Sequence, residues 1–310
     1  MTIDDETLDG LITVRDWLRF AASRFGEAEL VYGHGTASAL DEAAFLILSV
    51  LHLAHDQLEP WLDARLTMPE RRAIAEIIAR RIETRKPAPY LVGAAYIQGR
   101  RFHVDERVIV PRSYLGELLC QGGLAPVLPD QIEHVLDLCT GSGCLAILAA
   151  LTFPDAKVDA TDISPGALEV AARNVKTYDL ADRIRLEAGD LLDAIGDATY
   201  DVILANPPYV AQPEVAAFAP EYAAEPLLAH AGGDDGLDLV RRILARAARH
   251  LPPDGVLVVE IGTGRSALEA EFPALPFVWL DTETSEGEVL ALRRSDLEYE
   301  IVPLPQAGRG

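Results

Sequence analysis

The feature that most constrains the fold of this chain is the alternation of strand and helix patterns after Pro129-Asp130. The apolar stretches from His134 to Leu138 and from Lys157 to Thr161 are each followed by a helical pattern. Such alternation is typical of a parallel sheet with helices on both faces. We therefore predict an α/β domain over residues 129–305. Its seven strands are expected at 134–138, 157–161, 184–187, 200–205, 256–261, 276–280 and 289–292, the last two without a helix between them.

The part of the chain before this domain has helical spacing instead. From Leu11 to about Arg85, apolar residues recur every three or four positions in three stripes. This spacing predicts a small bundle of three amphipathic helices. We place the helical domain at residues 1–87.

A linker region joins these two parts. Residues 88–128 are predicted to contain a β-hairpin between Ala95 and Val110, because strand formers flank turn positions there. Pro111-Arg112-Ser113 follows and starts a linker helix that stops at Gly122-Gly123. The alternative for Pro111-Arg112-Ser113 is a loop that closes over a bound cofactor. At the far end of the chain, residues 306–310 are expected to form a flexible tail.

The chain carries a strong excess of acidic residues. Its 27 Lys+Arg against 49 Asp+Glu give a formal net charge of -22. Phosphate binding depends on clustered cations, so this balance argues against direct binding of nucleic acid. A basic partner suits the charge better, although acidic proteomes adopt the same balance for solubility.

The sequence lacks the usual signals for export, membrane insertion and metal binding. Asp4, Asp5 and Glu6 differ from the basic start of a signal peptide, and the longest apolar runs are too short to span a bilayer. We therefore expect a cytoplasmic protein without membrane contact. The cysteines lack the paired spacing of metal ligands, so we expect no metal site and three buried thiols, Cys120, Cys139 and Cys144.

A glycine loop lies where the first predicted strand of the α/β domain meets its helix. Asp137-Leu138-Cys139-Thr140-Gly141-Ser142-Gly143 places glycines where a ligand can approach the backbone and the helix N-terminus. The residues from Gly141 to Ala146 also match the loose dinucleotide-binding fingerprint, with alanine in the last position. A nicotinamide or flavin enzyme therefore remains an alternative. Asp137 favours S-adenosylmethionine instead, because a carboxylate suits the cationic amino-acid end of that cofactor better than a pyrophosphate.

Acidic residues follow the next two strands as well. Asp162 is suited to accept hydrogen bonds from both ribose hydroxyls, and Asp190 is placed to meet the adenine amino group. Helix capping by Asp162 and a turn role for Asp190 are the plain alternatives. Ile163 and Leu191, which follow these acids, are assigned to the same cofactor site. Open α/β sheets bind ligands at the carboxyl ends of their strands, so the series predicts a class I, Rossmann-like methyltransferase that uses S-adenosylmethionine. The full series is Asp137, Asp162, Asp190 and Asn206.

After the fourth predicted strand the chain turns through Asn206-Pro207-Pro208-Tyr209. Proline fixes its own φ and lacks an N-H, and it pushes the preceding residue toward extended geometry. The Asn206 side-chain oxygen and the Pro207 carbonyl are thereby held toward one spot, where they suit the two protons of an NH2 group. The plain alternative is a strand that leaves the sheet through an ordinary Asn-Pro turn.

The proline corner and the glycine loop together resemble the HemK-type protein glutamine N5-methyltransferases, and the resemblance covers nearly the whole chain. Further segments resemble the branch that methylates ribosomal protein L-three. These are Tyr32-Gly33-His34-Gly35-Thr36, Asp41-Glu42-Ala43, Val104 to Val108, Val110-Pro111-Arg112-Ser113 and Asp162-Ile163-Ser164-Pro165. The branch that acts on release factors usually has Pro-Arg-Pro where this chain has Pro111-Arg112-Ser113.

The resemblance implies S-adenosylmethionine as cofactor, held by Cys139 to Gly143 with Asp162. It implies that Asn206 and Pro207 bind the substrate amide and that Tyr209 packs beside it, so these three form the predicted catalytic set. Pro208 and Arg112 are counted with the substrate-binding residues.

Two positions depart from the family pattern. Leu191 stands where many relatives have an aromatic residue near the adenine, and the acidic turn Glu283 to Glu288 replaces a glycine-rich one. The expected substrate is free ribosomal protein L-three before assembly, recognised by the helical domain and the hairpin. The sequence leaves the oligomeric state open.

The mechanism that follows from the corner needs no general base. Asn206 and Pro207 would favour a pyramidal amide nitrogen whose lone pair points at the methyl group, and the proton leaves afterwards. His230 and Glu225 are expected to be structural. The alternatives are a release-factor methyltransferase, a DNA adenine N6-methyltransferase, a nicotinamide oxidoreductase and a binding module without activity.

Overall fold

The computed structural model describes residues 3–298, so the tail expected at 306–310 lies outside the described residues. The chain divides into two compact units. The first, the helical unit, comprises Met1–Tyr96, Val104–Glu106 and Phe218–Glu225. The second, the sheet unit, comprises Ile97–His103, Arg107–Ala217 and the residues from Pro226 onward. No helix in the described part of the chain has the length and apolar character needed to cross a bilayer.

Three long helices build the helical unit, as the apolar spacing predicts. They are α2 (Val14–Glu27), α3 (Ala39–Val50) and α4 (Met68–Thr84). Shorter elements accompany them: α1 (Asp5–Gly10), η1 (Glu59–Trp61) and α5 (Ala88–Val92). Thr13 and Asp16 cap the start of α2 reciprocally, which satisfies backbone N-H groups that the helix itself leaves unpaired. The bundle core is apolar and includes the buried side chains of Trp17, Phe25, Leu46, Ile47, Ile74 and Ile78.

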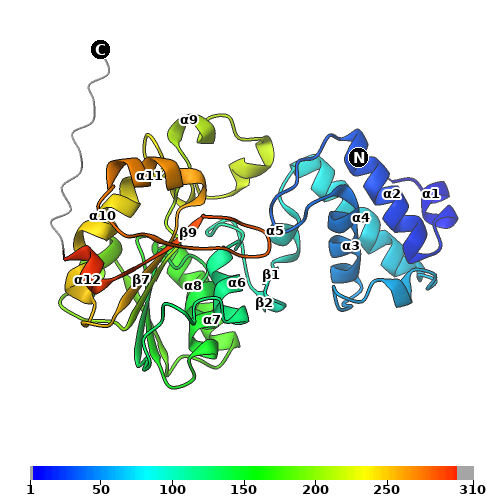
Figure 1. Ribbon diagram of the computed structural model, residues 1–310. Helices are drawn as coiled ribbons and strands as arrows, with labels where there is room; N and C mark the ends of the chain where they lie inside the picture. Colours follow the sequence, from blue (N-terminus) through cyan, green and yellow to red (C-terminus); the bar gives the residue numbers. More distant parts are fainter. Residues whose placement is uncertain (1–2, 299–310) are drawn as a thin grey trace, which may run out of the picture. The chain divides into compact units, whose positions relative to one another are not determined.

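The sheet unit is built on a seven-stranded sheet with the order β5-β4-β3-β6-β7-β9-β8. Figure 1 shows this sheet with helices on either side of it. Five strands run parallel: β3 (His134–Leu138), β4 (Lys157–Asp162), β5 (Ile184–Ala188), β6 (Val202–Ala205) and β7 (Val256–Glu260). β9 (Val289–Arg293) is antiparallel to both β7 and β8 (Val278–Leu280). The predicted class I fold is therefore confirmed, including the final strand pair without a helix.

Successive strand residues face opposite sides of the sheet and so create two cores. On one face, Val135 and Val258 pack with α6 (Tyr114–Gln121), α7 (Cys144–Thr152) and α8 (Pro165–Thr177). On the other, Leu136 and Val259 pack with α10 (Asp238–Ala247), α11 (Arg265–Glu271) and α12 (Arg294–Leu297). The remaining short elements are η2 (Leu191–Ile195), α9 (Gln212–Val215), η3 (Pro220–Ala224), η4 (Leu227–Ala229), η5 (Ala248–His250) and η6 (Gly262–Gly264).

The hairpin is shorter than predicted. β1 (Ala95–Ile97) and β2 (Arg100–Phe102) form a two-stranded sheet. The prediction that Val108-Ile109-Val110 belongs to it is wrong, because these residues lie outside any strand. Pro111 follows directly and offers no N-H to a ladder. Val108 and Val110 are buried by side-chain packing without sheet pairing.

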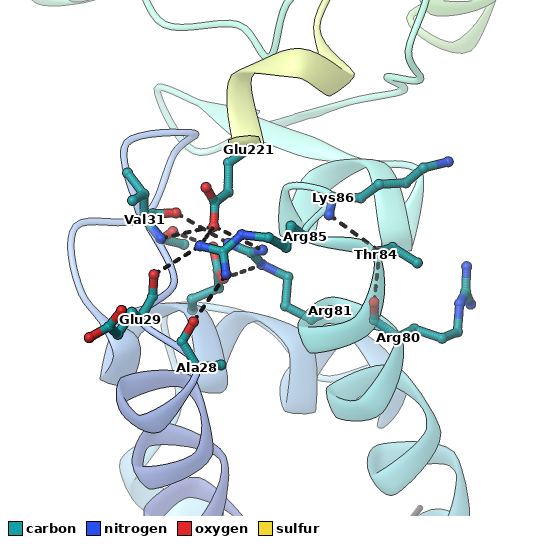
Figure 2. A network of polar contacts seen from close by, with 11 residues as sticks. Ala28, Glu29, Val31, Arg80, Arg81, Thr84, Arg85, Lys86 and Glu221 are labelled. Atoms are coloured by element: carbon teal, nitrogen blue, oxygen red, sulfur yellow. Dashed lines mark hydrogen bonds and ion pairs between the residues drawn. The ribbon is translucent and has the colours of Figure 1, made fainter. Parts of the chain in front are cut away.

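A buried charge pair joins two helices of the helical unit. The fully buried Arg81 on α4 places its Nε 2.6 Å from Oε1 of Glu42 on α3. Its Nη2 donates to the Val31 carbonyl at 3.2 Å (Figure 2). The Thr36 hydroxyl donates to the second oxygen of Glu42 at 3.0 Å. Burial raises the pKa of Glu42, and the charge of Arg81 opposes that shift. A buried ion needs such partners because water cannot solvate it.

Removing Arg81 should therefore unfold the helical unit more readily. We expect Arg81→Met to lower the free energy of unfolding by about 3–5 kcal/mol, since it leaves a buried carboxylate without its counter-ion. Chemical denaturation of the full chain, followed by circular dichroism, measures this loss. Arg80→Met is the matched control, because Arg80 is exposed on the same helix. A loss for Arg81→Met that equals the control would contradict the role of the pair.

Candidate active site

The proline corner lies at the carboxyl edge of the sheet, directly after the buried strand β6. Asn206 is half-buried and lines a cavity at this edge. Its Nδ2 donates to the backbone carbonyl of Arg112 at 3.4 Å. Because Nδ2 is engaged as a donor, Oδ1 is the atom of this side chain left to accept a hydrogen bond. The corner therefore leaves one side-chain oxygen at the cavity that can accept a hydrogen bond.

Tyr209, the last residue of the corner, is held by a buried carboxylate. Its hydroxyl donates to Oε1 of Glu260 at 3.2 Å, and Glu260, the last residue of β7, is only 1% exposed. Burial, followed by the negative charge of Glu260, raises the pKa of Tyr209, which keeps the phenol a neutral donor. The Tyr209 ring also packs on Gly262, where a Cβ atom would lie 2.8 Å from two ring carbons. The ring position thus depends on two residues at the carboxyl end of one strand, Glu260 and Gly262.

The second oxygen of Glu260 fixes the segment that supports Asn206. Oε2 accepts hydrogen bonds from the Ser113 hydroxyl at 2.7 Å, from the Tyr114 N-H at 3.0 Å and from the Leu115 N-H at 3.4 Å. These donors lie at the start of helix α6, so Glu260, at the end of strand β7, caps the N-terminus of that helix. Burial raises the pKa of Glu260, whereas these hydrogen bonds lower it.

The sequence analysis did not predict Glu260 as a residue of the site. A signal exists, because this acid ends an otherwise apolar strand at the edge where the predicted ligand acids also lie. The prediction that a helix starts after Pro111-Arg112-Ser113 is confirmed, since α6 begins at Tyr114. The Ser113 side chain itself does not cap that helix; it donates to Glu260.

A cavity of about 290 Å³ opens beside the corner. Eight of the predicted site residues line this cavity, and they lie at or just after the carboxyl ends of parallel strands. They are Cys139, Gly141, Asp162, Ile163, Asp190, Leu191, Asn206 and Pro208. The segments around Val108, Leu228 and Arg242 complete the lining. Pro207, Tyr209 and Arg112 are not among the lining residues, and Arg112 meets the site through its carbonyl.

Asp162 and Asp190 are both at the cavity, each with a partner. Asp162 Oδ2 accepts from the Gly141 N-H and Oδ1 from the Ser164 N-H, both at 2.9 Å. A carboxylate oxygen can accept more than one hydrogen bond, so Asp162 keeps capacity for hydroxyl donors. Burial raises the pKa of Asp162. Asp190 forms an ion pair with Arg242 at 2.7 Å, which the sequence did not suggest.

The start of the glycine loop lies behind the cavity rather than on its wall. Asp137 is fully buried, and its Oδ2 accepts from the Thr140 hydroxyl at 2.5 Å and from the Ala146 N-H at 3.0 Å. Its Oδ1 has no hydrogen-bond partner among the described residues. Burial raises the pKa of Asp137 to about 7. Ser142 and Gly143 are buried at the start of α7, away from the lining.

These residues suit a polar ligand that carries hydroxyl groups and a cation. Asp162 can accept from hydroxyls, and the unpaired oxygen of Asp137 is a buried acceptor whose ionised form a nearby cation would stabilise. Ile163 and Leu191 add apolar surface for a flat ring. Among residues 3–298, no group of three His, Cys, Asp or Glu side chains is arranged to hold a metal ion.

Comparison with known proteins agrees with this chemistry. Residues 122–222 match the model of the methyltransferase small domain family. The crystal structure of the hMettl16 catalytic domain in complex with MAT2A 3'UTR hairpin 1 has a TM-score of 0.51 at 14% identity, covering 90% of this chain and 91% of that one. At this identity the likeness concerns the fold alone.

Two curated relatives are much more similar, and both are named ribosomal protein uL3 glutamine methyltransferase. The protein of Bradyrhizobium diazoefficiens is 54% identical over 295 residues, covering 93% of this chain and 92% of its own length. That of Bordetella pertussis is 55% identical over 289 residues, covering 93% and 97%. With the corner, the glycine loop and the sheet in place, the chain belongs to the family of ribosomal protein uL3 glutamine methyltransferases.

Proposed function

We propose that this protein methylates the side-chain amide nitrogen of a glutamine in ribosomal protein uL3, the L-three protein, before the ribosome is assembled. The observation that carries the proposal is the Asn206 amide, whose Nδ2 is engaged by Arg112 so that Oδ1 can accept a substrate N-H. The names of the relatives support uL3 as substrate. We place the reaction in the cytoplasm, where free ribosomal proteins occur.

The cofactor we propose is S-adenosylmethionine. Asp162 would accept from its ribose hydroxyls, and Ile163 and Leu191 would contact its adenine. Asp137, buried behind the cavity wall, would favour its ammonium group through charge rather than by direct contact. Asp190, although paired with Arg242, would lie near the adenine amino group. When bound, this cofactor supplies the methyl group. Residues Cys139 to Gly143 shape the loop that admits it.

The chain's own residues would contribute position and charge. Asn206 Oδ1 and the Pro207 carbonyl would bind the two amide protons of the glutamine and turn its nitrogen lone pair toward the methyl group. Tyr209 and Pro208 would confine the amide, and the proton would leave to solvent after transfer. A positioned pair of acceptors can lower the barrier by several kcal/mol, because it also stabilises the positive charge that develops on nitrogen.

The other candidates fit the molecule less well. A DNA adenine methyltransferase would need a cationic face for phosphates, whereas the chain has a formal charge of -22. A nicotinamide enzyme would leave the proline corner without a role. Ser113, where the release-factor branch has proline, donates to Glu260 and thereby takes part in the site.

The substrate proposal predicts methylation of purified uL3. Free uL3 should gain one methyl group on a glutamine, at a second-order rate that falls as salt rises from about 50 to 500 mM, because the Debye length shortens from roughly 14 to 4 Å. Mass spectrometry and initial rates measure both effects. Assembled large subunits should be poorer substrates, as RNA covers the basic protein. Faster methylation of a release factor would contradict the choice of uL3, and methylation of duplex DNA alone would contradict a protein substrate.

The role of Asn206 is tested by Asn206→Ala. This change should lower kcat/KM for uL3 by about 10²- to 10³-fold, the usual effect of losing one polar group that stabilises the transition state. Affinity for S-adenosylhomocysteine, measured by calorimetry, should stay within a few-fold of the parent value. Turnover close to the parent would exclude Asn206 as the acceptor.

The contact between Glu260 and Tyr209 is tested by a double-mutant cycle. Glu260→Gln and Tyr209→Phe should each lower kcat/KM, but the double variant should be less impaired than the product of the single effects predicts. The expected coupling is about 0.5–3 kcal/mol, as for residues in direct contact. If Glu260 served only to cap α6, the two effects would be additive.

A further inference from the structure

The turn that follows strand β5 carries a carboxylate at the wall of the active-site cavity. Asp190 and Leu191 both line this cavity, and Asp190 directly precedes the short helix η2. The Asp190 side chain nevertheless makes no capping hydrogen bond to η2. A role as a helix cap therefore does not explain this acid.

Arg242 of α10 holds the Asp190 carboxylate instead. Its Nη2 donates to Asp190 Oδ2 at 2.7 Å, and both residues belong to the sheet unit. Because this contact engages Oδ2, Oδ1 is the oxygen of the carboxylate left to accept a hydrogen bond from a ligand. Arg242 also lines the cavity, and the two side chains are each 43% exposed. A ligand in the cavity can therefore reach the pair.

The segments that carry the pair are fixed to one another. Leu191 is buried with a φ of 51°, a left-handed conformation that such a side chain rarely adopts. Gly189 packs so closely on Ala194 that a Cβ atom on it would lie 2.7 Å from the Ala194 Cβ. The apolar side chains of η2 and α10 share one core cluster. The turn and the helix thus set where the carboxylate and the guanidinium meet.

A second ion pair joins the same two segments away from the cavity. Arg246, one helical turn after Arg242 on α10, pairs with Asp193 of η2. Neither Arg246 nor Asp193 is among the residues that line the cavity. Of these two pairs of the same chemistry, only the first reaches the ligand site. Tying α10 to η2 does not require a pair at the cavity wall, so the first pair has a further role.

That role follows from what a carboxylate can recognise. An ionised carboxylate accepts hydrogen bonds and cannot donate them. It therefore favours a base that presents an amino group, such as adenine, over one that presents a carbonyl oxygen at the same position, such as hypoxanthine. An exposed carboxylate is free to turn toward water unless a partner holds it, and an arginine does so through a charge-assisted hydrogen bond.

We propose that Arg242 is a positioning residue that makes the cofactor site select a 6-aminopurine over a 6-oxopurine, by holding Asp190 Oδ1 toward the base. This inference deepens the proposed function and rests on the cofactor assigned there. Arg242 acts through Asp190, so its effect concerns the choice of base.

The test compares the affinities of the full chain for S-adenosylhomocysteine and S-inosylhomocysteine, measured by calorimetry. The parent should favour the adenosyl compound by about 10- to 100-fold, the range for a hydrogen bond to a charged group. Arg242→Met should reduce this ratio to within about fivefold, because the carboxylate is no longer held toward the base. The ratio is the readout, since a general loss of fit would lower both affinities alike.

Arg246→Met is the matched control, because it removes the neighbouring ion pair of α10 outside the cavity. It should leave the ratio unchanged. Asp190→Asn should lower the ratio as Arg242→Met does, since an amide donates as well as accepts. Adding Arg242→Met to Asp190→Asn should then change the ratio no further, because Arg242 acts through the carboxylate.

Three results would each overturn the inference: a parent ratio near one, an unchanged ratio in Arg242→Met, or an equal fall in Arg246→Met. These binding measurements need no uL3. A parent protein that shows the expected ratio but leaves uL3 unmethylated would refute the proposed function and leave this inference standing. Methylation of uL3 by a parent without preference between the two compounds would refute this inference alone.

Discussion

The hydrogen-bond register of strand β6 is the constraint on which the site depends. β6 lies between β3 and β7, and Ala205 pairs with Leu138 on one side and Val259 on the other. Because these strands are parallel, the residues that follow the paired positions emerge side by side at one edge. This register brings together Cys139, Asn206 and Glu260, three residues that lie far apart in the sequence. A slip of one residue would turn each side chain to the other face.

The site also depends on how the acceptors themselves are held. Asn206 can serve as an oriented acceptor because the Arg112 carbonyl takes the hydrogen bond from its amide nitrogen. Arg112 is in turn followed by Ser113, whose hydroxyl binds Glu260. The same carboxylate binds Tyr209. One buried acid thus links the two segments that would enclose a substrate amide.

Both units use a buried glutamate to join parts of the chain that lie far apart in sequence. Glu260 joins the end of β7 to the start of α6, and Glu221 joins the loop after the corner to α4 and its C-terminal Arg85. A buried carboxylate is costly unless several donors surround it, so it specifies a particular arrangement more strictly than an apolar contact does. These two acids add to the negative charge of the chain, but they are buried and so cannot contact a basic binding partner.

The sequence by itself determined the sheet, the helical bundle and the order of the acids that follow its parallel strands. Apolar periodicity reports burial directly, which is why the strands from His134 to Arg293 and the helices α2 to α4 were predictable. It could not show that Val108 and Val110 are buried outside a sheet, because packing against distant residues decides that. Nor could it show that Asp190 pairs with Arg242, since that contact depends on the placement of α10. The roles of Glu260 and Glu221 were decided only by tertiary structure, because a carboxylate reveals its partners only when the chain brings distant donors to it.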